Sequence, residues 1–111
     1  MFSAWLFRWS SWWRRPRGAD LEHLHFLLYA RPGCHLCEVA WRQLQAAQRR
    51  HRFSLKEVDV DAEPELAARY GSLVPVVAVN GKVRFRGAIN EVLLDRLLRA
   101  ENLKSAKAMR N

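Results

Sequence analysis

Two cysteines separated by two residues join a short apolar segment to a helical pattern, and this junction limits the folds open to the chain. The run LHFLLYA at 24–30 is bounded by turn residues, which predicts a buried strand. Arg-Pro-Gly then turns the chain, and Cys34 and Cys37 follow at once. Between residues 35 and 50, apolar side chains recur on one helical face. Both thiols should therefore lie at the start of a helix.

The rest of the chain predicts three more strands and two more helices. Residues 53–60 alternate well enough for a strand, with a change of phase near Lys56. A short helix is expected at 65–70, and a longer one at 89–100. Between these helices, two apolar runs flank Asn80-Gly81, which favours a type I′ hairpin turn.

The element order is therefore β-α-β-α-β-β-α. Because helices join the first three strands, right-handed parallel crossovers are expected between them, and the hairpin makes the last strand antiparallel. The prediction is an α/β protein with a four-stranded mixed sheet and helices on both faces. One domain should occupy residues 21–100, after a Trp- and Arg-rich extension at 1–20 that is amphipathic or disordered. Residues 101–111 are expected to form a frayed polar tail.

The charge and cysteine content exclude several classes of protein. Net charge is +8, and four arginines with no acid give +4 to residues 1–19 alone. No basic cluster alternates with aromatic residues in the domain, so no nucleic-acid partner is expected. Two cysteines in 111 residues are too few for a disulfide scaffold, and the N-terminal segment lacks the order of a secretory signal. A cytoplasmic protein is expected.

Tryptophan is concentrated in the N-terminal extension. Trp5, Trp9, Trp12 and Trp13 fall on one helical stripe, with arginines on the opposite side. The stripe could pack on the domain, be disordered, or lie at a membrane surface, where Trp and Arg suit an interfacial helix. Peripheral membrane contact is the hypothesis drawn from it.

Three stretches together resemble the thioredoxin fold, and within it the small glutaredoxin-like proteins. They are YARPGCHLCEVA, VDVDAEPELAARYG and VPVVAVNG, and the resemblance spans about 24–100. Helix N-termini stabilise a thiolate, which is the nucleophile in disulfide exchange. Cys34 would then attack a substrate disulfide, and Cys37 would resolve the mixed disulfide.

Four residues are expected to support the cysteines: the resemblance implies Arg31, Val74 and Pro75, and His35 follows from its position between the two cysteines. Arg31 takes the place of a lysine common in glutaredoxins, where it could favour the thiolate and attract a glutathione carboxylate. His35 either tunes the thiolate when protonated or is an exposed neutral imidazole. Pro75 matches a cis proline that faces the cysteines, so Val74 would offer its backbone to an extended substrate.

Two departures from the resemblance concern the reductant and the proton relay. Gly87 is retained after the hairpin and is expected, with Arg31 and Val74, to contact glutathione or the substrate. Ile89 and Asn90, however, replace an acidic pair that helps glutaredoxins hold glutathione. Glutathione is therefore only a candidate co-substrate, although backbone N–H groups at that helix start could still bind a carboxylate. Leu28 stands where thioredoxins carry a proton-relaying acid, which argues against a thioredoxin-type mechanism.

The functional prediction is a glutaredoxin-like thiol–disulfide oxidoreductase acting on protein or glutathione mixed disulfides. It is expected to be a monomer with no resident cofactor and no metal. Two alternatives stay open: a thioredoxin-fold binding module with little turnover, and a metal or iron–sulfur site at the two cysteines. The histidines at 23, 25 and 51 are too scattered to complete a zinc site.

Overall fold

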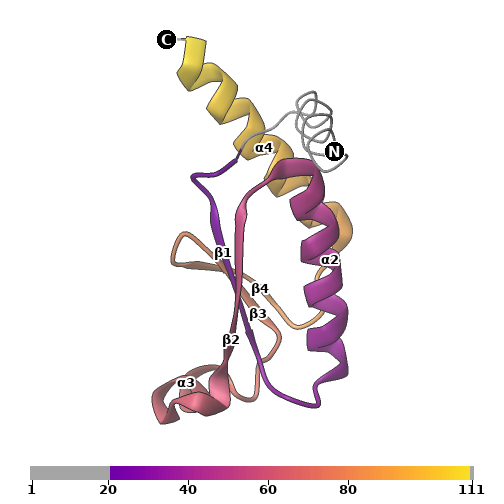
Figure 1. Ribbon diagram of the computed structural model, residues 1–111, viewed down its shortest axis with the longest axis vertical. Helices are drawn as coiled ribbons and strands as arrows, with labels where there is room; N and C mark the ends of the chain where they lie inside the picture. Colours follow the sequence, from indigo (N-terminus) through magenta and orange to yellow (C-terminus); the bar gives the residue numbers. More distant parts are fainter. Residues whose placement is uncertain (1–20, 111) are drawn as a thin grey trace, which may run out of the picture.

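The order of helices and strands along the chain is the predicted one. A computed structural model describes residues 21–110 (Figure 1), so the Trp- and Arg-rich extension lies outside the described part. The elements are β1 His25–Ala30, α2 His35–His51, β2 Ser54–Asp59, the 3-10 helix η1 Val60–Ala62, α3 Pro64–Tyr70, β3 Val76–Val79, β4 Lys82–Arg86 and α4 Glu91–Arg110.

The sheet is mixed, but the direction of one strand differs from the prediction. The spatial order is β2-β1-β3-β4, and β1 pairs parallel with β2. β3 runs antiparallel to both β1 and β4, so the expected parallel crossover into β3 is wrong. The reason is the length of α3, whose 7 residues span only about 10 Å. That is too short to return the chain along a strand of about 20 Å, so β3 starts at the edge where β2 ends.

Helices cover both faces of the sheet, as predicted. α2 and α4 pack against one face, where Phe26 and Leu28 of β1 meet Leu44 of α2 and Leu98 of α4 in a single buried core. The other face carries α3 at one end (Figure 1). There Tyr29 of β1 stacks on Tyr70 of α3, with ring centroids 4.5 Å apart.

The hairpin between β3 and β4 has the predicted turn. Asn80 and Gly81 both take positive φ, at 51° and 85°, as a type I′ turn requires. Asn80 also accepts a hydrogen bond through Oδ1 from the His25 backbone N–H, at 2.7 Å. The turn therefore fixes the start of β1 as well as the hairpin.

Helix α4 is longer than predicted. It continues through Arg110, where the sequence was expected to fray beyond residue 100. The segment contains no proline or glycine. Asp95 pairs with Arg99 and Glu101 with Lys104, at the helical spacings that support an exposed helix.

Candidate active site

A tight turn delivers Cys34 to the start of α2. Arg31 accepts a backbone hydrogen bond from Cys34 at 3.2 Å, and Gly33 takes a φ of 81° between them. Proline followed by a glycine with positive φ is the arrangement of a type II turn. Cys34 itself has extended backbone angles and is the N-cap residue of the helix.

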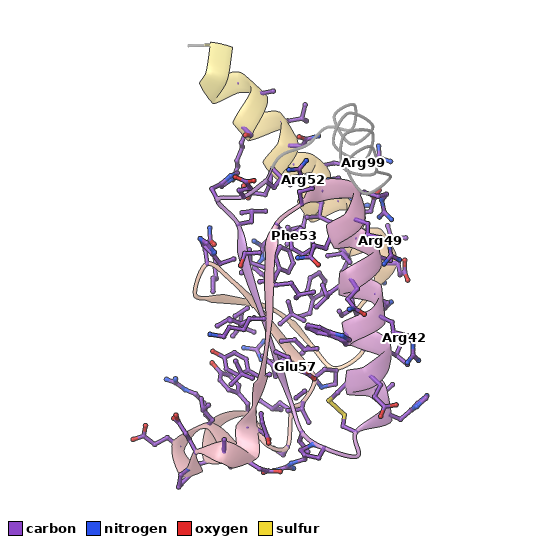
Figure 2. The ribbon with its side chains drawn as sticks, viewed as in Figure 1. Arg42, Arg49, Arg52, Phe53, Glu57 and Arg99 are labelled. Carbon is purple, nitrogen blue, oxygen red and sulfur yellow. A yellow bond between two sulfur atoms is a disulfide. The ribbon has the colours of Figure 1, made fainter. Side chains whose placement is uncertain are left out.

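The two cysteines are joined in a disulfide on the first turn of α2. Figure 2 shows it as the yellow bond at the end of the helix. The Cα atoms of Cys34 and Cys37 are 5.2 Å apart, within the normal range for a disulfide. Cys34 is partly exposed, Cys37 is only 2% exposed, and the Cys37 N–H donates to Cys34 Sγ at 3.1 Å. The sulfur of Cys34 thus takes the place of a capping oxygen.

The other residues singled out from the sequence come to the same edge of the sheet. β1, β2 and β4 end at this edge and β3 begins there, so Arg31, Val74-Pro75 and Gly87 lie around it. The Val74-Pro75 bond is cis, as the resemblance implied. Gly87, with a φ of 82°, donates its N–H to the Pro75 carbonyl at 2.7 Å. This bond holds the proline loop against the end of the hairpin.

The guanidinium of Arg31 is engaged on both of its sides. Nε and Nη2 donate to the two carboxylate oxygens of Asp61 at 3.2 and 2.9 Å, and Nη1 donates to the Gly71 carbonyl at 2.8 Å. The hydrogen bonds from Arg31 lower the pKa of Asp61, and those to Asp61 raise the pKa of Arg31. A Cβ at Gly71 would clash first with the Ala67 carbonyl oxygen and would also lie 2.8 Å from Arg31 Nη2, so the glycine suits both the end of α3 and the arginine.

The residues that replace the acidic pair have structural roles. Ile89 is buried in the core. Asn90 Oδ1 accepts from the N–H groups of Val92 and Leu93 at 2.9 and 3.1 Å, so two of the free donors at the start of α4 are already satisfied. Those two donors are not free to bind a carboxylate.

His35 is exposed on the first turn of α2. Within the described part of the chain, its side chain makes no hydrogen bond or ion pair. Its expected influence on the thiolate stays a prediction.

A cavity of about 330 Å³ opens beside the disulfide. It is lined by Ala30, Arg31, Pro32, Gly33, Cys34, Cys37, Glu38, Glu57 and Asp59. The three acidic residues, Glu38, Glu57 and Asp59, were not predicted as site residues. The only sign of one of them was the break in apolar alternation near Lys56, next to Glu57. The core-facing side of β2 is apolar up to Leu55, which packs against the core, and becomes acidic at Glu57.

The described residues contain neither a group suited to hold a metal ion nor a membrane-spanning helix. Between residues 21 and 110, no group of three or more His, Cys, Asp and Glu side chains is placed to hold a metal ion. Over the same residues, no helix has both the length and the apolar character needed to cross a bilayer.

Comparison with known proteins places these features in a family. The model of the "Glutaredoxin-like domain (DUF836)" matches residues 25–99. A structural-genomics protein from X. campestris is 29% identical, covering 68% of this chain and 96% of its own, with a TM-score of 0.57. A protein from Nitrosomonas europaea is 25% identical, with coverages of 67% and 89% and a TM-score of 0.60.

More distant structures share the fold alone. A mutant thioredoxin from Halobacterium salinarum is 18% identical, covering 75% of this chain and 78% of its own, with a TM-score of 0.57. No curated protein matches the chain.

Proposed function

Because the chain belongs to the glutaredoxin-like domain family, we propose that it is a thiol–disulfide oxidoreductase with Cys34 as nucleophile and Cys37 as resolving thiol. The observation that carries this proposal is the capping geometry. Cys34 Sγ accepts the Cys37 N–H at the amino end of a 17-residue helix, and Cys34 is the more exposed of the two cysteines. A hydrogen-bond donor and the positive end of the helix dipole both favour a thiolate at that atom.

The reaction follows from the difference in exposure between the two sulfurs. In the reduced protein, the Cys34 thiolate attacks one sulfur of a substrate disulfide, and the other sulfur leaves as a thiolate. Cys37 then attacks Cys34 Sγ, releases the second substrate thiol and closes the disulfide present in this structure. The substrate gains two electrons and the dithiol loses two. An external thiol must restore the dithiol before the next turnover.

The substrate should bind along the edge of the sheet beside the cysteines. Val74 can offer its backbone N–H and C=O to an extended segment, as a short added strand, and the cis Pro75 positions that backbone. Gly87 supports the proline loop through its hydrogen bond to Pro75. A contact between Arg31 and a glutathione carboxylate would compete with Asp61, so glutathione is a weaker candidate substrate than a protein disulfide.

The experiment that tests the proposal is trapping of the mixed disulfide. Cys37→Ser should react with a disulfide substrate and stop at a covalent adduct on Cys34, because the resolving thiol is missing. Mass spectrometry gives the mass and site of the adduct. Cys34→Ser, which keeps one thiol in the same loop, should form far less adduct because Cys37 is buried.

Turnover assays then separate the substrate classes. The wild-type protein should reduce a protein disulfide with dithiothreitol as electron donor, and its rate with a glutathione mixed disulfide measures the glutathione alternative. A Cys37→Ser protein that forms no adduct on Cys34 would reject the proposal and favour a binding module.

A further inference from the structure

Glu57, an acidic residue on β2, is exposed to solvent, although its position on the strand lies on the core side of the sheet. Side chains alternate along a strand, so Leu55 and Glu57 lie on the same face. In the parallel register Leu55 pairs with Phe26 and Glu57 with Leu28, and both of these partners are fully or almost fully buried. Figure 2 labels Glu57 between β2 and α2, on the side of the sheet that carries the disulfide. The register therefore places an exposed carboxylate on the core side of the sheet, at the cavity beside the disulfide.

No contact within the described part of the chain accounts for this carboxylate. Glu57 makes no hydrogen bond or ion pair with any residue between 21 and 107. It lines the cavity of about 330 Å³ that also contains Cys34 and Cys37. Because the Glu57 side chain is exposed, its carboxylate is hydrated and carries no burial penalty. Among these residues the carboxylate has no structural role, and it is available as a proton acceptor beside the two cysteines.

The resolving step needs a group of this kind. Cys37 is 2% exposed, and it must lose its proton before its sulfur can attack. Among the side chains that line the cavity, Arg31 cannot accept a proton, which leaves three carboxylates. Asp59 already accepts the backbone N–H of Asp61 at 2.9 Å. Glu38 and Glu57 are both exposed, but only Glu57 lies on the sheet face of Leu28, which shares a buried core with Cys37.

We propose that Glu57 accepts the Cys37 proton in the resolving step, a role that rests on the proposed oxidoreductase function. The Cys37 S–H bond breaks and its proton passes to the Glu57 carboxylate, directly or through water in the cavity. The Cys37 sulfur then bonds to Cys34 Sγ, the bond from Cys34 to the substrate sulfur breaks, and the substrate leaves as a thiolate. Protonated Glu57 returns the proton to solvent or to that leaving thiolate. Glu57 thus acts on the second step and leaves the first attack unassisted.

The two steps can be timed separately with dithiodipyridine, a neutral disulfide that releases one absorbing pyridinethione in each step. In stopped flow, the first phase depends on reagent concentration and reports attack by Cys34. The second phase is independent of concentration and reports resolution by Cys37. Glu57→Gln should slow the second phase by about 10²-fold near neutral pH, the lower end of what general base catalysis supplies, and change the first by less than about twofold. The difference should shrink at alkaline pH, where hydroxide removes the proton.

Matched variants separate proton transfer from a simple change of charge. Glu57→Asp keeps a carboxylate and should recover part of the second rate. Glu65→Gln makes the same charge change on exposed α3 and should alter neither phase. Glu38→Gln removes a different carboxylate from the same cavity and should have a much smaller effect.

The outcomes that overturn the proposal differ from failure of the proposed function. Equal slowing of both phases by Glu57→Gln, an unchanged second phase at every pH, or equal slowing by Glu38→Gln would each remove the assigned role. Absence of a first phase in the wild-type protein would instead reject the oxidoreductase function itself.

Discussion

The carboxyl end of α2 is held by three hydrogen bonds, whereas its amino end holds the disulfide beside an open cavity. At the carboxyl end, Arg52 takes a φ of 58° and donates its N–H to the Gln48 carbonyl at 2.7 Å. Gln48 donates to the Phe53 carbonyl at 2.9 Å, and the His51 carbonyl accepts from Leu21 at 3.1 Å. The polar groups at this end are used to fix the fold.

The amino end uses its polar groups differently. Its side-chain cap is a sulfur of the disulfide, which the proposed reaction would break and re-form, and the cavity beside it is lined by carboxylates. The two ends of the helix therefore differ: the carboxyl end contributes stability, and the amino end carries the dithiol of the proposed reaction. Changes at the two ends should have separable effects.

The largest effect on stability is expected from Phe53→Ala at the carboxyl end. Phe53 is 2% exposed and stacks on Phe26 with ring centroids 4.1 Å apart. Removing the ring should lower the free energy of unfolding by about 3–5 kcal/mol, measured by urea denaturation. The control at the amino end is Leu36→Ala, where a side chain 49% exposed should change stability by less than about 0.5 kcal/mol.

A second substitution keeps this test informative if Phe53→Ala does not fold. Phe53→Leu retains most of the buried volume and should lose less stability in the same direction. Equal losses for the Phe53 and Leu36 variants would contradict the division between the two ends.

A smaller loss of stability is expected when the pH is lowered, because His51 then takes up a proton. Its Nδ1 is buried without a hydrogen-bond partner in the described structure, and burial, followed by the nearby charge of Arg50, lowers its pKa. The unfolded chain therefore binds this proton at higher pH than the folded protein does. The contribution of neutral His51 to the free energy of unfolding is complete above about pH 6.5, the usual pKa of histidine. It is lost as the pH falls from there through the lowered pKa of His51 in the folded protein.

Urea midpoints measured between about pH 8 and pH 5 test this contribution. His51→Gln should lose less stability across the interval than the wild-type protein. His25→Gln, an exposed control on β1, should keep the wild-type slope. Equal slopes for all three proteins would show that His51 does not contribute to the pH dependence.

Deletion of the N-terminal extension is expected to have the smallest effect on the rate of disulfide reduction. The same deletion tests the hypothesis that this extension contacts a membrane. Residues 1–20 join the fold at Leu21, which is bonded to the carboxyl end of α2, away from the cysteines. Deleting residues 1–19 should abolish flotation with anionic liposomes and leave the rate of disulfide reduction unchanged. Equal flotation of the full and shortened chains would end the membrane hypothesis.

Features set by a few neighbouring residues were predictable from the sequence. Pro32 and Gly33 encode the turn before the dithiol, and Asn80-Gly81 encode the hairpin. The position of Cys34 at a helix start follows from the apolar period of residues 35–50. Each of these depends on backbone preferences or periodicity within a few turns of chain.

Features that depend on contacts between distant segments could not be predicted from the local sequence. The direction of β3 depends on how far the short α3 can carry the chain. The partners of Arg31 lie 30 and 40 residues away, at Asp61 and Gly71, and no local pattern marks them. The break in apolar alternation near Lys56 was visible in the sequence. Only the strand register, which pairs Glu57 with Leu28, shows on which face of the sheet the acid lies.

The sequence by itself therefore determined where the dithiol lies along the chain and which cysteine begins the helix, because turn chemistry and helical period act over short distances. Only the tertiary structure decided what surrounds that dithiol. Strand register and the reach of α3 bring together side chains far apart in sequence, and those contacts have no local signature in the chain.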